Sequence, residues 1–299
     1  MHRRFVTLDV FTDRRFAGNP LAVVLDPEGL DGAAMQAIAR EFNLSETVFV
    51  LPPADPRHRA HLRIFTPVAE LPFAGHPTVG SAVLLARIDG GGERRDIVVE
   101  EGIGAVRCTA TPRDAERGHA RFDLARLPAE TGRAPDAPAI AAALGLDTSD
   151  IGFDGFAPAR WSAGALYTFV PVRGLAAIGR CRVDLARWDA AFGRDQHGEP
   201  YVFCRETAEA GHAFHARMFA PRMGITEDPA TGSAAAAFAG MLARCAPPPD
   251  GTHDYDIEQG YEMGRPSLIR LTVTMKGGEL AAAAIGGEAI VVSEGMIEA

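Results

Sequence analysis

The sequence predicts an α+β fold of two similar halves, in each of which short strands curl around one buried helix. A repeated motif is the first sign: residues 76–82, HPTVGSA, are matched by residues 228–234, DPATGSA, and a strand-like phrase, RIFTP or RMFAP, precedes each copy. The helix expected after each copy has almost no polar face, so it must be buried on all sides. Many short apolar runs are separated by turn residues, which is typical of curled sheets.

The elements of the first half follow from periodicity and turn residues. Apolar runs at residues 5–11 and 21–25, separated by the turn at residues 16–20, predict two strands. Apolar residues at helical spacing then predict a helix over residues 31–42. The elements expected next are strands at 46–51 and 61–65, the first motif helix at 77–87, and strands at 97–101 and 104–109.

The second half runs similarly. It is expected to contain a strand at 120–124, helices at 138–144 and 184–192, strands at 165–172, 200–206 and 213–219, the second motif helix at 229–244, a hairpin of strands 267–275 and 279–285, and a last strand at 289–294. That last strand is expected to return to the first half. We therefore predict a first half-domain of residues 1–117 plus a C-terminal strand within 287–299, a second half-domain of residues 118–286, and an active-site cleft between them.

Composition excludes several classes of partner. The net charge of −9 and the absence of a basic cluster argue against nucleic acid and against a membrane surface. The first residues lack an apolar signal segment and no run reaches membrane-spanning length, so a cytoplasmic location is expected. A small-molecule substrate and a second copy of the chain are the expected partners.

No metal ion or organic cofactor is expected. The four cysteines have no metal-ligand spacing. The pairs His58/His61 and His212/His215 have ligand-like spacing, but strand geometry is expected to place the second pair on opposite faces, and no third ligand accompanies either pair. Lys276 is the only lysine and lies in a predicted turn, which argues against a Schiff-base mechanism.

The two motif copies place unlike acid/base groups before a proline. His76 and Asp228 each precede a proline that is expected to begin a helix, and Asp is a strong N-cap residue. The first amides of such a helix, with its dipole, can bind an anion such as a substrate carboxylate. The alternative is that these residues only cap helices, but two matching copies on buried helices favour a site.

Glu46 is the third titratable candidate. It lies at the start of an apolar strand, where partial desolvation raises the pKa of a carboxyl group and suits it to take and return a proton. The alternative is a solvated charge at a strand end.

Several motifs together resemble one family over nearly the whole chain and in the expected order. These are FAGNP at 16–20, NLSETVF at 43–49, FTP at 65–67, FAGHPT at 73–78, EDPATGS at 227–233, and QG at 259–260 with GRPS at 264–267. In these motifs the chain resembles the PhzF family of phenazine-biosynthesis-type isomerases.

The resemblance implies a diaminopimelate-epimerase-like fold, with two pseudo-symmetric β-barrel-like halves around central helices, and a homodimer. It also implies isomerisation of a substrate like trans-2,3-dihydro-3-hydroxyanthranilate by proton transfer between carbons, without a cofactor. The acid/base glutamate falls on Glu46, and supporting polar residues fall on His76, Asp228 and Ser233. Gly75 and Gly232 are expected to give the close backbone around the substrate, and Asn19 is expected to line the site.

Two alternatives to this isomerase are open to test. Related racemases use one cysteine from each half, but here Ala74 and Ala230 occupy those positions, which excludes two-thiol chemistry. A catalytically silent binding or scaffold protein with the same fold has no need for Glu46, His76 and Asp228 together, so an active enzyme is favoured.

Overall fold

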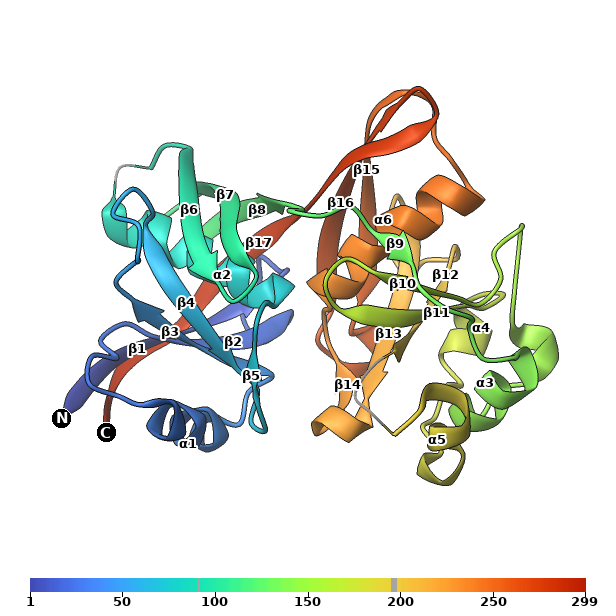
Figure 1. Cartoon of the computed structure of the whole chain (residues 1–299), viewed down its shortest axis with the longest axis horizontal. Helices are drawn as coiled ribbons and strands as arrows, with labels where there is room; N and C mark the ends of the chain where they lie inside the picture. Colours follow the sequence, from blue (N-terminus) through green and yellow to red (C-terminus); the bar gives the residue numbers. More distant parts are fainter. Residues whose placement is uncertain (91, 195–197) are drawn as a thin grey trace. The chain divides into compact units, whose positions relative to one another are not determined.

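The computed structural model describes residues 1–90, 92–194 and 198–299, which form two compact units (Figure 1). The first unit comprises Met1–Ala125 and Gly286–Ala299, and the second comprises Arg126–Ile285. Within the described ranges, no helix has both the length and the apolar character needed to cross a membrane.

In the first unit, the strands close into a ring. Its elements are β1 (His2–Val10), β2 (Asn19–Val24), α1 (Gly32–Phe42), β3 (Glu46–Leu51), β4 (Ala60–Phe65), β5 (Glu70–Leu71), α2 (Gly75–Asp89), β6 (Arg95–Glu101), β7 (Gly104–Pro112), β8 (Arg117–Asp123) and the second part of β17 (Glu279–Glu298). The pairings run from β1 through β2, β3, β4, β6, β7 and β8 to β17, which pairs with β1 again. Figure 1 shows the two ends of the chain side by side, where His2 pairs with Glu298.

Helix α2 is the centre of the first unit. It contacts β1, β2, β3, β6, β7 and β8, and twelve of its residues, from Gly75 to Ala86, are buried. Helix α1 begins after Asp31, whose carboxylate accepts the N–H of Ala34, and it packs instead against β3 and β4. The prediction that the first motif helix is buried on all sides is confirmed.

The second unit is built around α6 (Gly232–Cys245). Its other elements are β9 (Ala129–Glu130), α3 (Ala137–Leu144), β10 (Ala159–Ser162), β11 (Leu166–Pro171), α4 (Leu175–Ile178), α5 (Leu185–Phe192), β12 (Glu199–Cys204), β13 (Phe214–Ala220), β14 (Ile225–Asp228), β15 (Gly251–Gln259), β16 (Ser267–Lys276), three short 3₁₀ turns and the start of β17. On α6, Phe238 packs against the aromatic rings of Phe169, Phe203 and Phe214, with ring centroids 4.7 to 5.6 Å apart. The second motif helix is therefore buried as well.

The two units repeat one strand order. In the first, β2 is parallel to β3, β3 is antiparallel to β4, β4 is parallel to β6, and β6 is antiparallel to β7. In the second, β11, β12, β13, β15 and β16 pair in the same directions. The short strands β5 and β14 pair with β4 and β13, just before each central helix. The predicted α+β fold of two pseudo-symmetric halves is confirmed.

Three sequence-based expectations about elements are wrong. The central helices begin at Gly75 and Gly232, not at the prolines of the motif. The last two expected strands are one continuous strand, β17, because Gly286 and Gly287 adopt extended backbone and do not make a turn. Strand β15 was not expected, because its sequence, GTHDYDIEQ, is polar and carries no strong apolar alternation.

We expect one glycine in each central helix to respond differently to alanine. A Cβ on Gly240 lies 2.5 Å from two atoms of the Trp161 ring, whereas a Cβ on Gly80 lies 2.7 Å from one methyl carbon each of the buried side chains of Leu21 and Val10. Alanine adds about 1 kcal/mol of helix propensity at either site, but overpacking a rigid ring costs about 1–3 kcal/mol. Gly240→Ala should therefore lower the Tm clearly and Gly80→Ala much less. Equal Tm values in thermal unfolding would contradict this packing.

Candidate active site

The first unit brings four of the expected site residues together. Asn19 begins β2, Glu46 begins β3, and the two strands are parallel neighbours in which Leu21 pairs with Glu46. Gly75 and His76 are the first two residues of α2, and His76 reaches both strands through contacts with Pro20 and Glu46. Asn19 and His76 are almost inaccessible to solvent. The start of α2 and the ends of two strands thus form one polar cluster in an apolar interior.

His76 is oriented by a hydrogen bond from one ring nitrogen, and its other ring nitrogen faces Glu46. Its Nε2 lies 3.3 Å from Glu46 Oε2 and has no hydrogen-bond partner in the described part of the chain, so Nδ1 donates to the backbone carbonyl of Pro20. Burial lowers the pKa of His76 to about 3, and the Pro20 bond opposes this shift only weakly. At neutral pH the ring is uncharged, and the lone pair of Nε2 faces the Glu46 carboxyl group. The contact is therefore not an ion pair.

Glu46 is buried. Only 11 % of its side chain is exposed, and its oxygen faces an imidazole and not solvent. The alternative of a solvated charge at a strand end does not fit this position. A carboxyl group here can exchange a proton with a bound molecule without competition from bulk water.

Asp228 lies at the end of a strand. It ends β14, and α6 begins four residues later at Gly232 with Thr231 as the N-cap residue. The expectation that Asp228 caps this helix is wrong. Its carboxylate instead accepts the hydroxyl proton of Thr231 at 2.6 Å.

Gln259 fixes the segment between Asp228 and the helix. Its Nε2 donates to the carbonyl of Asp228 at 2.7 Å and to Thr231 Oγ1 at 3.0 Å, and its Oε1 accepts the Thr231 N–H at 3.1 Å. Gln259 is fully buried, and all its polar atoms are used. These bonds hold Thr231 outside the helix, which explains why α6 starts late.

Ser233 is the second residue of α6 and lies beside Tyr167. Its Oγ is 2.6 Å from the hydroxyl of Tyr167. The hydroxyl of Tyr201 is fully buried and, within the described ranges, makes no hydrogen bond. Burial chiefly, then the nearby Tyr167 and Asp228, raises the pKa of Tyr201, so it remains a neutral donor. Asp228, Gly232 and Ser233 therefore belong to one cluster in the second unit.

The free helix amides lie at other residues than expected. In α2 the Thr78 N–H already donates to Ala74, so the amides without an intrahelical acceptor are those of Gly75 and His76. In α6 the Ala235 N–H donates to Thr231, which leaves Gly232, Ser233 and Ala234. Both glycines expected at the site are thus the first residues of a central helix.

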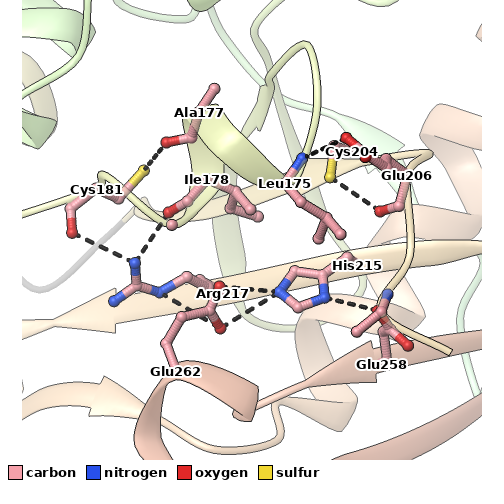
Figure 2. Close-up of polar contacts among 12 residues, drawn as sticks. Leu175, Ala177, Ile178, Cys181, Cys204, Glu206, His215, Arg217, Glu258 and Glu262 are labelled. Carbon is pink, nitrogen blue, oxygen red and sulfur yellow. Dashed lines mark hydrogen bonds and ion pairs between the residues drawn. The ribbon is translucent and has the colours of Figure 1, made fainter.

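The pair His212 and His215 does not lie on opposite faces as expected. Both Nδ1 atoms are 2.7 Å from the carboxylate of Glu258, because His212 lies in the turn before β13 and not on the strand itself. Figure 2 shows His215 between Glu258 and Glu262. The described residues contain no group of three or more histidine, cysteine or acidic side chains arranged to hold a metal ion.

Sequence reasoning missed Tyr167, Tyr201 and Gln259 as members of the second cluster. The tyrosines lie in apolar strands, where a tyrosine is ordinarily a core residue. Gln259 is part of a motif quoted above, and a buried strand-end amide before a glycine is the signal that could have identified it.

Comparison with known proteins finds relatives over nearly the whole chain. The family model of phenazine biosynthesis-like proteins matches residues 8–295. An uncharacterized isomerase of Mesorhizobium japonicum is 53% identical over 99% of this chain and 98% of its own. The trans-2,3-dihydro-3-hydroxyanthranilate isomerase of Pseudomonas aeruginosa is 35% identical over 99% of each chain. A crystal structure of a PhzF-family protein from Bacillus anthracis covers all of both chains with a TM-score of 0.89 at 25% identity.

The Glu258 network predicts a pH-dependent stability. Burial lowers the pKa of His215, but its hydrogen bonds with Glu258 and Glu262 outweigh burial and raise it to about 9, from 6.5. Between these values the native state binds more protons, so stability falls as pH rises, by up to about 1.4 kcal/mol per pH unit. His215→Asn should lose this part of the slope in thermal unfolding. His253 is half-buried, and His253→Asn should keep this part of the slope. An unchanged slope in His215→Asn would disprove its assignment to His215.

Proposed function

The chain belongs to the phenazine biosynthesis-like family, and on this basis we propose that it is an isomerase that moves a proton between two carbons of a small carboxylated substrate. The substrate class we propose resembles trans-2,3-dihydro-3-hydroxyanthranilate, which is named for a relative at 35% identity. The observation that carries the proposal is the buried pair of Glu46 Oε2 and His76 Nε2 at 3.3 Å. We propose that the reaction needs no organic cofactor or metal ion.

The pair can hold one proton. A lone pair on Nε2 that faces an ionised carboxylate is repulsive, and a proton between the two atoms removes the repulsion. With that proton Glu46 is an acid, and without it Glu46 is a base. An isomerisation has no net proton change, so one group that removes a proton from one carbon and returns it to another is sufficient.

The polar groups of the second unit supply binding. We assign the substrate carboxylate to the start of α6, where the amides of Gly232 and Ser233 and the Ser233 hydroxyl are available to an anion. We assign an amino or hydroxyl group of the substrate to Asp228. Asn19 and Gly75, beside His76 and Glu46, complete the surroundings of the reacting carbons.

Replacing Glu46 by Gln tests the proton transfer. Gln keeps the shape of the side chain but cannot carry the proton, so deuterium uptake from D₂O into a candidate substrate should fall by about 10²–10⁴-fold. Tm and substrate binding should stay close to wild type, and Glu41→Gln on the exposed face of α1 serves as the control. Full exchange in Glu46→Gln would refute the role. Binding without exchange in the wild-type protein would favour the silent binding protein.

A homodimer stays a prediction. Sedimentation velocity should show a species of twice the 31.8 kDa chain mass. A single species of the chain mass at micromolar concentration would contradict it.

A further inference from the structure

Strands β6 and β15 end in matching tripeptides, Glu100-Glu101-Gly102 and Glu258-Gln259-Gly260. These strands occupy the same place in the strand order of the two units, because β6 is parallel to β4 and β15 is parallel to β13. In register, His61 pairs with Glu100 and His215 pairs with Glu258. The two tripeptides are therefore structural counterparts.

The first glutamate of each tripeptide holds a loop in the same way. Glu100 accepts the N–H groups of Ala54 and Asp55 at 2.8 Å each, and lies 2.9 Å from His58 Nδ1. Glu258 accepts the N–H groups of Ala208 and Glu209 and lies 2.7 Å from His212 Nδ1. The spacing of these partners along the chain is also the same in both units, so the counterpart relation extends to side-chain contacts.

The second residue of each tripeptide contacts a threonine at the start of the central helix. Gln259 forms hydrogen bonds with Thr231 and with the Asp228 carbonyl, as described above. Glu101 Oε1 lies 2.7 Å from Oγ1 of Thr78, in the first turn of α2 and two residues from His76. Glu101 is 5 % exposed and Gln259 is fully buried. A glutamate thus occupies a buried position that is an amide in the other unit.

The third residue lets the strand end approach the segment before the helix. A Cβ on Gly102 would lie 2.8 Å from Pro72 Cα, and one on Gly260 would lie 2.6 Å from the Pro229 oxygen. Each proline precedes the first helical glycine, Gly75 or Gly232, by three residues. Both tripeptides therefore clamp the entry to a central helix.

The hydrogen bonds of Thr78 determine the charge of Glu101. Thr78 Oγ1 lies 2.8 Å from the Ala74 carbonyl oxygen and 2.7 Å from Glu101 Oε1, but a hydroxyl has only one proton to donate. In helices, a threonine hydroxyl commonly donates that proton to the carbonyl four residues earlier. Both contacts are then hydrogen bonds only if Glu101 carries a proton of its own and donates it to Thr78.

The surroundings also disfavour a charge on Glu101. Its Oε2 is buried and has no hydrogen-bond partner among residues 1–90, 92–194 and 198–299. The titratable group that faces it from β7 is the Cys108 thiol, whose pKa is raised by burial, by Glu101 and by Asp123 of β8; from α2 it meets the Thr78 hydroxyl. Burial raises the pKa of Glu101 itself to about 8.

We propose that Glu101 is a positioning residue that, as a neutral carboxylic acid, holds the first turn of α2 and hence His76 in the way that Gln259 holds Asp228. The part that concerns His76 rests on the proposed function. When Glu101 ionises, it can only accept the hydroxyl proton of Thr78, so the first turn of α2 loses the hydroxyl bond to the Ala74 carbonyl and keeps only the bond from the Thr78 N–H. Glutamine at this position keeps a donor at every pH.

Thermal unfolding against pH tests the protonation without any assay of activity. The unfolded chain releases the Glu101 proton near 4.5 and the native chain near 8, so the native state binds more protons between these values. Wild-type stability should fall across this range, and Glu101→Gln should lose that part of the fall. The Tm of Glu101→Gln relative to wild type should rise by more than about 4 °C between pH 5 and 8. Glu279→Gln, at an exposed strand end, should show no such change.

Parallel Tm curves for wild type and Glu101→Gln would overturn the proposal. A second readout is the infrared difference spectrum of wild type minus Glu101→Gln at pH 7. It should contain the C=O stretch of a protonated carboxylic acid, and a carboxylate band alone would also overturn it.

The reciprocal change tests the counterpart relation. Gln259→Glu places a carboxyl group beside Asp228 and removes one of the two donated bonds, so its Tm should fall progressively below wild type as pH rises above about 5. A pH-independent Tm difference would refute the relation.

A measurement of turnover tests the part of the proposal that depends on the proposed function. If the wild type is active, deuterium uptake should fall at least tenfold in Glu101→Ala and recover in Glu101→Gln. In Glu101→Gln, the alkaline limb of the profile of uptake rate against pH should shift to higher pH. Equal loss in both variants would refute the positioning role. No uptake in the wild-type protein would refute the proposed function, while the Tm and infrared results would still decide the state of Glu101.

Discussion

The burial of a helix without a polar face is the constraint on which both units depend. The sequences of α2 and α6 leave no side to present to water, so strands must surround each helix. Because strands surround each helix, water does not reach its first turn, and the polar groups there need hydrogen-bond partners within the protein. The candidate site residues gather at these two helix starts because unsatisfied amides and buried side chains coincide there.

Each helix start satisfies its polar groups differently. At α2 the partners are a neutral imidazole and two carboxyl groups, Glu46 and Glu101. At α6 they are the Gln259 amide, the Asp228 carboxylate with the Thr231 hydroxyl, and the paired hydroxyls of Ser233 and Tyr167. The first set can store and move a proton, whereas the second can orient polar groups of a ligand without changing its own charge.

The sequence was sufficient for the fold class and for most elements, since strands such as residues 46–51 and both apolar helices have strong periodicity. It was misleading about which residues of the two units are equivalent. The motif alignment matches His76 with Asp228, but counting from the helix starts matches His76 with Ser233, and strand pairing matches Leu71 with Asp228. A local motif cannot reveal that Gln259, distant in sequence, holds Asp228 and Thr231 before the start of the second helix. The same reason hid the tyrosines, which reach the second cluster only through tertiary packing.

Strand β17 has a consequence for how the chain is made. Its second part supplies the strand between β8 and β1, so the ring around α2 is incomplete until residues 286–299 have been synthesised. The entire second unit is translated in the meantime, which takes on the order of ten seconds or more. During that interval, the edges of β1 and β8 that later pair with β17 are unpaired and lie beside an apolar helix. Such unpaired edges favour binding by chaperones. The first unit therefore cannot close its ring until the entire second unit has been synthesised.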